Sequence, residues 1–233
     1  MTTEISADIT AEIASNIAAI QARIAAAARS AGRNPAATQL VAVSKQQPED
    51  RIRAALRAGH RVFGENRVQE AAGRWPGLKA EFPDVELRLI GHLQTNKVKQ
   101  ALDLFDAIET VDRPHLAAAL AREMAKTAKR SPCLIEVNTA EVAQKGGIMP
   151  GDADAFIGLC RDIHGLPIVG LMCIPPLEEE PSPHFALLAK IAGRNGLSVL
   201  SMGMSADFEI AVRLGATHVR VGTAVFGARR SIG

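Results

Sequence analysis

Residues 39–45 read QLVAVSK, and this short stretch indicates how the chain folds. The five residues from Leu40 to Ser44 are apolar or small and include two valines, which favours a buried β-strand over a helix. Side chains alternate between the two faces of a strand, so Val41, Val43 and Lys45 share one face. If the two valines face a core, the amine of Lys45 points the same way, into the interior at the end of a strand.

Lys45 is therefore a candidate nucleophile. An amine buried at a strand end is costly as a cation, and a neutral lysine is suited to forming a Schiff base with a carbonyl compound. The alternative is that Lys45 only ends the strand while its ammonium group reaches water, as most lysines do. The strand alone favours this second interpretation. Residues elsewhere in the chain are needed to distinguish the two.

Further apolar runs follow the first at regular intervals, and patterns typical of helices lie between most of them. These runs span residues 61–64, 87–91, 106–111, 133–138, 168–174, 198–202 and 217–222. Alternating β and α elements predict a parallel sheet, and eight such units predict a (β/α)₈ barrel of the TIM type. Isoleucines at helical spacing over residues 7–30 predict an extra N-terminal helix. An open, doubly wound sheet is the alternative.

The composition limits the class of protein. The 233 residues are 47% hydrophobic, which suffices for a sizeable core, and a net charge of +2 argues against nucleic acid or an anionic membrane as the main partner. No apolar run approaches the roughly 20 residues of a membrane span, and the polar N-terminus is unlike a signal peptide. Three cysteines at scattered spacings predict a cytoplasmic protein without a zinc site. We see no linker, so residues 1–233 are expected to form one domain.

Two glycine-containing turns are candidates for binding a phosphate group. In (β/α)₈ barrels phosphate often binds after strands 7 and 8, where backbone amides and hydroxyls are available near a helix start. The seventh predicted strand ends in Ser201-Met202-Gly203-Met204-Ser205, and the eighth ends in Gly222-Thr223. The alternative is that both are ordinary turns, in which serine, threonine and glycine are common.

Arg220 shares a face of the eighth predicted strand with Gly222, so it projects into the barrel beneath the predicted phosphate site. A guanidinium group inside a barrel needs an acceptor. That acceptor is either a carboxylate, from Glu109 or Glu136, or the ring nitrogen of a bound heterocycle. A Schiff-base lysine, a phosphate site and an arginine for a ring nitrogen together point to pyridoxal 5′-phosphate.

With these motifs in place, the chain resembles the pyridoxal-phosphate homeostasis proteins, single-domain relatives of the alanine racemase barrel. The resemblance covers nearly the whole chain. Its most specific segments are VAVSK at 41–45, FGENRVQE at 63–70, IGHLQTNKVK at 90–99, GLMCIPP at 170–176 and LSMGMSADFEIAVRLGATHVRVGTAVFG at 200–227. The chain departs from the family pattern at Cys173, where a threonine is more usual, and in lacking the usual aromatic residue before IGHLQ. Neither departure falls on a predicted cofactor position.

The resemblance implies a cofactor site. Lys45 would hold pyridoxal 5′-phosphate as an internal aldimine, Asn66 would lie beside the ring, and Arg220 would face the pyridine nitrogen. The segments that hold the phosphate contain Ser201, Met202, Gly203, Ser205, Gly222 and Thr223. Family members are thought to bind, buffer and deliver the cofactor and so to affect amino-acid and keto-acid balance. The implied partners are the cofactor and apo pyridoxal-phosphate-dependent enzymes, and we expect a monomer or weak dimer.

The residues themselves also favour a protein that is not an enzyme. Arginine keeps its proton, so it leaves the pyridine nitrogen uncharged and the ring a weak electron sink. Related racemases use a tyrosine from a second domain as the opposing base, whereas this sequence contains no tyrosine, and we expect no second domain. Two alternatives remain. One is a racemase with His92 or Lys145 as its second base, and the other is a Schiff-base aldolase that acts on a sugar phosphate without a cofactor.

Overall fold

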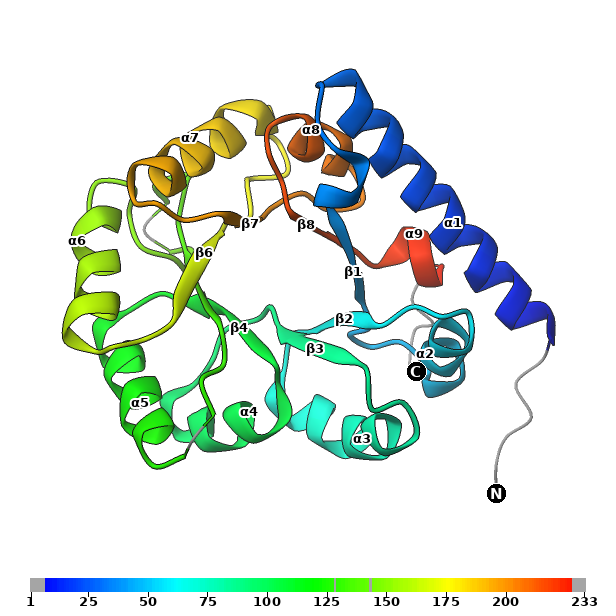
Figure 1. Cartoon of the computed structure of the whole chain (residues 1–233), viewed down its shortest axis with the longest axis horizontal. Coiled ribbons are helices and arrows are strands. Elements are labelled where there is room, and N and C mark those ends of the chain that lie inside the picture. The colour runs from blue at the N-terminus through cyan, green and yellow to red at the C-terminus, as the bar shows by residue number, and fades with distance from the viewer. Residues whose placement is uncertain (1–6, 128, 143, 228–233) are drawn as a thin grey trace.

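Eight short segments rich in valine, leucine and isoleucine pair in parallel and close into a barrel (Figure 1). The computed structural model describes residues 7–127, 129–142 and 144–227. The strands are β1 Gln39–Val43, β2 Val62–Glu65, β3 Glu86–Leu89, β4 Ala107–Val111, β5 Cys133–Glu136, β6 Ile168–Met172, β7 Val199–Ser201 and β8 His218–Val221. The barrel closes because β1 pairs with β8, which confirms the predicted barrel and shows that the open-sheet alternative is wrong.

Helices surround the barrel and follow each strand in turn (Figure 1). They are α2 Glu49–Arg57, α3 Val68–Glu81, α4 Val98–Leu104, α5 Pro114–Ala125, α6 Ala153–Gly158, α7 Pro181–Arg194, α8 Phe208–Arg213 and α9 Thr223–Phe226. Two 3₁₀ turns, η1 Pro35–Ala37 and η2 Thr95–Lys97, precede β1 and α4, and a π-helical turn, η3 Leu159–Ile163, extends α6. Because all eight strands run in parallel, their C-terminal ends lie together at one face of the barrel and their N-terminal ends at the opposite face.

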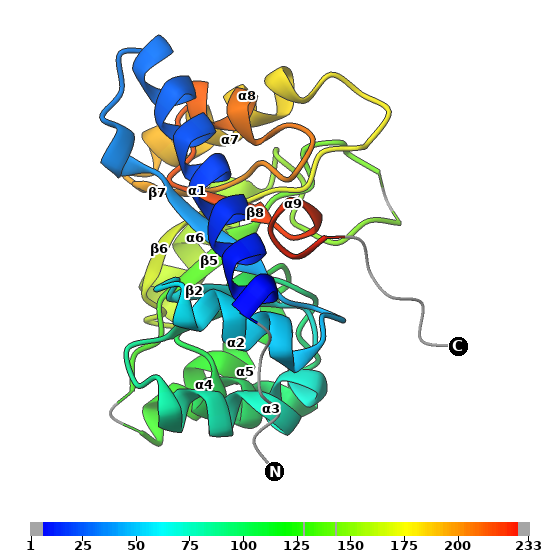
Figure 2. The ribbon, with the colours of Figure 1, turned by 90° about the vertical axis from the view of Figure 1, so that its right-hand side faces the viewer.

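The predicted N-terminal helix is confirmed as α1 Ala7–Ser30, and it completes the outer layer. Its isoleucines at helical spacing are buried. Helix α9, which follows β8, has only 4 residues and cannot cover the outer face of the strands beside it. Helix α1 lies in that place, against α2, α8 and α9 (Figures 1 and 2). One link is a hydrogen bond of 3.0 Å from the Asn16 Nδ2 atom to the Val225 carbonyl.

The two faces of β1 meet different surroundings, as the alternation of the sequence predicts. Leu40 and Ala42 pack into the apolar layer between the sheet and the helices. Val41 points into the barrel, where its Cγ1 atom lies 3.1 Å from the position that a Cβ atom would take at Gly64. The inward direction of this face carries Lys45, just beyond the strand, to the mouth formed by the C-terminal strand ends.

Within the described ranges, no helix is both long enough and apolar enough to cross a membrane. The first residues of the polar N-terminus, 1–6, lie outside those ranges. The same holds for the C-terminal residues 228–233.

Candidate functional site

A cavity of about 160 Å³ lies at the C-terminal ends of the strands, the face of such barrels that carries chemistry. Among the predicted site residues it brings together Lys45, Asn66, Ser205, Arg220, Gly222 and Thr223. Val43, Gln47, Ile90, Ile174 and Met204 complete its lining. Residues from both ends of the sequence therefore meet in one place, because β1 and β8 are neighbours in the closed barrel.

A tight turn places Lys45 at this cavity. The Gln47 amide donates a hydrogen bond of 3.1 Å to the Ser44 carbonyl, so residues 44–47 form a β-turn with Lys45 in its second position. Gln46, in the third position, has a φ angle of 57°, in the left-handed region that residues other than glycine seldom adopt. Because the chain reverses directly after Lys45, the half-buried lysine stays at the strand end and faces the cavity.

The two glycine-containing turns lie side by side. The Arg220 amide donates a hydrogen bond of 2.9 Å to the Gly203 carbonyl. Gly203 has a φ angle of 91°, and a Cβ atom there would lie 2.5 Å from the Cβ atom of Ala211, so no other residue fits. Ser205 and Thr223, one from each of these turns, both line the same cavity.

Three predicted residues of the first turn lie behind the cavity and do not line it. Ser201 is fully buried, and Met202 packs into the apolar layer outside the sheet. Gly203 is pressed against α8, which begins only at Phe208. A role for these residues in binding phosphate stays a prediction, and in this structure they support the turn from below.

Arg220 is 4% exposed and ends a polar network inside the barrel. Its guanidinium group donates hydrogen bonds to the Ser201 hydroxyl at 2.8 Å and to the Cys173 carbonyl at 2.9 Å. The Ser201 hydroxyl in turn donates a hydrogen bond of 2.5 Å to the buried Glu109 carboxylate. The same carboxylate accepts a hydrogen bond of 2.5 Å from Arg88. Burial opposes the charge of Glu109, but the two arginines and the hydrogen bonds outweigh it and lower the pKa of Glu109 below its usual value.

The sequence left a carboxylate or a heterocycle open as the partner of Arg220, and the structure adds a third possibility. A hydroxyl and a carbonyl are its direct partners, and Glu109 lies one hydrogen bond further away. Arg220 nevertheless belongs to the lining of the cavity.

The proposed second bases of a racemase do not line this cavity. His92 is largely exposed, and its Nδ1 atom lies 3.4 Å from the Asp112 carboxylate. It lines a neighbouring cavity together with Arg67, Gln94 and Lys97. Lys145 belongs to a loop that folds back on β5, where the Ile148 amide donates to the Glu136 carbonyl at 2.8 Å.

Comparisons with known proteins show which family the chain belongs to. The family described as "Alanine racemase, N-terminal domain" matches residues 15–230. A pyridoxal phosphate homeostasis protein of Pseudomonas aeruginosa is 41% identical over 207 residues, which cover 86% of this chain and 88% of the relative. The chain belongs to the pyridoxal phosphate homeostasis proteins of this family.

Solved structures of similar proteins confirm the fold. A protein of unknown function from Bifidobacterium adolescentis matches with a TM-score of 0.90 at 31% identity, over 95% of this chain and 97% of that one. PipY from Synechococcus elongatus, solved with PLP bound, matches with a TM-score of 0.79 at 35% identity. That match covers 92% of this chain and 100% of PipY. The family resemblance predicted from the sequence motifs is thereby confirmed.

Sequence reasoning missed several residues that line this cavity. Ile90 follows β3 directly, Ile174 comes shortly after β6, and Gln47 closes the turn that follows β1. The first residues after barrel strands face the mouth, so their position alone could have identified them. Met204 lies within the predicted phosphate turn, but the sequence does not show which side chains of a turn point inward.

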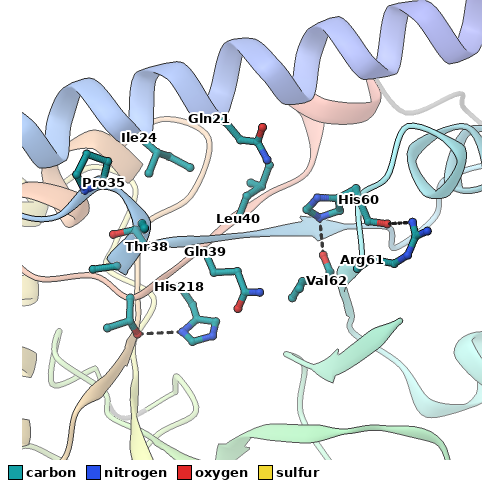
Figure 3. A pocket seen from close by; sticks show the side chains of 13 residues that line it. Gln21, Ile24, Pro35, Thr38, Gln39, Leu40, His60, Arg61, Val62 and His218 are labelled. Atoms are coloured by element: carbon teal, nitrogen blue, oxygen red, sulfur yellow. Dashed lines mark hydrogen bonds between the residues drawn. The ribbon is translucent and has the colours of Figure 1, made fainter. Parts of the chain in front are cut away.

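A larger cavity, of about 640 Å³, lies at the opposite end of the barrel beneath α1 (Figure 3). His60 and His218 lie there, near the starts of β2 and β8 (Figure 3). Burial lowers the pKa of both imidazoles, that of His218 to about 4. No lysine occurs among the described residues that line it, so its size does not make it the better candidate for a carbonyl ligand.

Glu136, the other carboxylate proposed as a partner of Arg220, lies beside Asp112 at the mouth. A Cβ atom at Gly146 would lie 3.7 Å from Glu136 Oε1 and 3.8 Å from Asp112 Oδ2. Burial raises the pKa of Glu136 to about 7, the charge of Asp112 adds to the rise, and Arg220 opposes it. Glu136 thus changes its charge near neutral pH.

Replacing Glu136 by glutamine is expected to flatten the dependence of folding stability on pH. The ordinary pKa of 4.5 rises to about 7 on folding, so between these values the native state holds a proton that the unfolded state has released. Stability therefore falls as pH rises through this window, and the Glu136→Gln variant lacks that fall. Urea unfolding at about pH 4.5 and at about pH 8 measures the difference in folding stability between the two pH values. The exposed Glu178→Gln variant is the control, and an unchanged fall in the Glu136 variant would contradict the prediction.

Proposed function

We propose that this protein binds pyridoxal 5′-phosphate covalently through Lys45 and serves in cofactor homeostasis, by binding, buffering and delivering it. The observation that carries the proposal is that a lysine, an arginine, a serine and a threonine line one cavity at the C-terminal barrel face. The names of the curated relatives and the PLP bound in PipY support it. In this proposal residues 1–233 act as a single cofactor-binding unit.

The residues present fit this cofactor. When bound, pyridoxal 5′-phosphate supplies an aldehyde that a lysine amine captures reversibly. The Asn66 Oδ1 atom is buried and accepts no hydrogen bond from any described residue, so it has an acceptor position to offer the hydroxyl group of the ring. The Ser205 and Thr223 hydroxyls, beside Gly222, suit phosphate oxygens.

Each remaining group has a role that follows from its place. Arg220 stays protonated and donates a hydrogen bond toward the pyridine nitrogen, which therefore remains uncharged. Its Ser201 and Cys173 partners hold the guanidinium plane in that direction. Ser201, Met202 and Gly203 act by shaping the turn that carries Ser205.

We further infer that the protein is not an amino-acid racemase and that apo pyridoxal-phosphate-dependent enzymes in the cytoplasm receive its cofactor. The 233 residues contain no tyrosine to act as an opposing base. His92 and Lys145 lie outside the lining of the Lys45 cavity, which leaves the racemase alternative without its proposed second base. A monomer or weak dimer suffices for this role, because the site is built from one barrel.

The loaded protein is expected to activate an apo cofactor-dependent enzyme while exchanging the α-proton of alanine only at a trace rate. A missing general base costs roughly 10²–10⁴-fold in rate. Nuclear magnetic resonance in deuterated buffer measures exchange of L- and D-alanine, and recovered activity of the apo enzyme measures delivery. Adding a phosphatase that destroys free cofactor distinguishes two routes of delivery. Direct transfer to the apo enzyme still restores its activity, whereas release of the cofactor into solution does not.

Two outcomes would count against the proposed function. Exchange at an enzymatic rate, on the order of 1–10³ per second, would support a racemase. An apo enzyme that stays inactive with the loaded protein, but responds to free cofactor, would argue against delivery.

A further inference from the structure

The turn that carries Lys45 is held from outside the barrel. Side chains alternate along β2, so Gly64 faces inward and Glu65 faces the helices. Glu65 is fully buried, and its Oε1 atom accepts hydrogen bonds from the Ser44 hydroxyl at 2.6 Å and from the Trp75 indole at 3.0 Å. A buried carboxylate of β2 is thereby bonded to the first residue of the Lys45 turn.

Arg74 of α3 completes this outer contact. One guanidinium nitrogen, Nη2, donates to Glu65 Oε1 at 2.7 Å and to the Ser44 carbonyl at 3.1 Å. The other, Nη1, donates to the Gln47 carbonyl at 2.8 Å. The planar fork therefore bonds both ends of the turn at once, and the Arg74 side chain is only 15% exposed.

This turn needs external support. Gln46 lies in the left-handed region, with a φ angle of 57°, and such a conformation persists only where the surroundings enforce it. Neither Glu65 nor Arg74 lines the cavity, so neither touches a ligand there. Their bonds to Ser44 and Gln47 hold the backbone at both ends of the turn and so restrict Lys45 and Gln46 between them.

We propose that Glu65 and Arg74 are positioning residues for Lys45, which keep its amine aimed into the cavity and so determine how completely a carbonyl ligand is captured. This inference rests on the proposed function. In the capture step, the Lys45 nitrogen forms a double bond to the aldehyde carbon. The carbonyl oxygen leaves as water and takes both amine protons, so the step is redox-neutral and needs no further reactant.

The test compares two ligands that differ in one group. Pyridoxal 5′-phosphate has the aldehyde, whereas pyridoxine 5′-phosphate has an alcohol in its place and cannot bond covalently to lysine. The Arg74→Ala variant is expected to lower the equilibrium constant for borohydride-trappable capture about tenfold or more, since it loses charge-assisted bonds to both turn carbonyls. Its affinity for pyridoxine 5′-phosphate should stay within about threefold of the wild type, since the other lining groups are unchanged.

A conservative variant and a matched control complete the experiment. Arg74→Lys should show an intermediate loss of capture, because a single ammonium group cannot hold both carbonyls. Lys79, also on α3, donates to the Leu104 carbonyl at 3.0 Å and to Asp106 at 2.6 Å, so it fastens a different loop. Lys79→Ala should change the binding of neither ligand.

The outcomes separate the inference from the proposed function. Equal losses for both ligands in Arg74→Ala, or capture unchanged from the wild type, would overturn the positioning role. A loss of capture in Lys79→Ala as large as that in Arg74→Ala would do the same. A wild-type protein that takes no borohydride-trappable label would instead refute the proposed function itself.

Discussion

Replacing Lys45 by alanine is expected to abolish covalent attachment of pyridoxal 5′-phosphate and to leave the fold intact. Lys45 lies half-buried at the mouth, outside the apolar layer that stabilises the barrel. The other groups expected to bind the cofactor stand elsewhere, Asn66 after β2 and Arg220 on β8. Borohydride reduction followed by peptide mapping should place the pyridoxyl group on Lys45 in the wild type and nowhere in the variant. Circular dichroism checks the fold.

Two further variants sharpen this test. Lys45→Arg keeps the positive charge but removes the nucleophilic amine, so it should also lose covalent attachment. Lys145→Ala, at a loop that does not line the cavity, should be labelled like the wild type. A label found mainly on Lys97 or Lys145 would show that the assignment to Lys45 is wrong.

Pyridoxal without its phosphate is expected to bind orders of magnitude more weakly than pyridoxal 5′-phosphate. Ser205, Gly222 and Thr223 line the cavity, and their hydroxyl groups and backbone amides are of the kind that suits a dianion. Each charge-assisted hydrogen bond that is lost costs on the order of 1.5–3 kcal/mol. Titration of the apo protein with each ligand, followed by absorbance, measures the ratio of the two affinities.

Variants at the two hydroxyl groups test where the phosphate preference arises. Ser205→Ala and Thr223→Val should each weaken binding of pyridoxal 5′-phosphate by roughly tenfold and leave binding of pyridoxal nearly unchanged. The control is Ser30→Ala, at the end of α1, whose hydroxyl donates a hydrogen bond of 2.8 Å to the Ala27 carbonyl of its own helix. Equal affinity of the wild type for the two ligands would refute a phosphate site in these turns.

Much of the fold follows from the sequence because the signals are local. Apolar runs such as 39–44 and 217–222 have the length of buried strands, and helical patterns separate them. Strand ends nevertheless differ from the predicted ones by up to two residues, as where 133–138 becomes Cys133–Glu136. Hydrogen bonds to neighbouring strands decide where pairing stops, and those partners are remote in sequence.

The sequence by itself also predicted part of the set of residues that line the candidate cavity. Alternation along β1 directs Lys45 inward, and the order of elements in a barrel brings it beside Gly222 and Thr223. Only the tertiary structure showed which buried residues contact and support these lining residues. It couples Ser201 to Glu109 and Arg220, and it brings Arg74 onto the carbonyls of the Lys45 turn. Such contacts depend on strand register, barrel closure and the direction of single side chains, which short-range patterns do not specify.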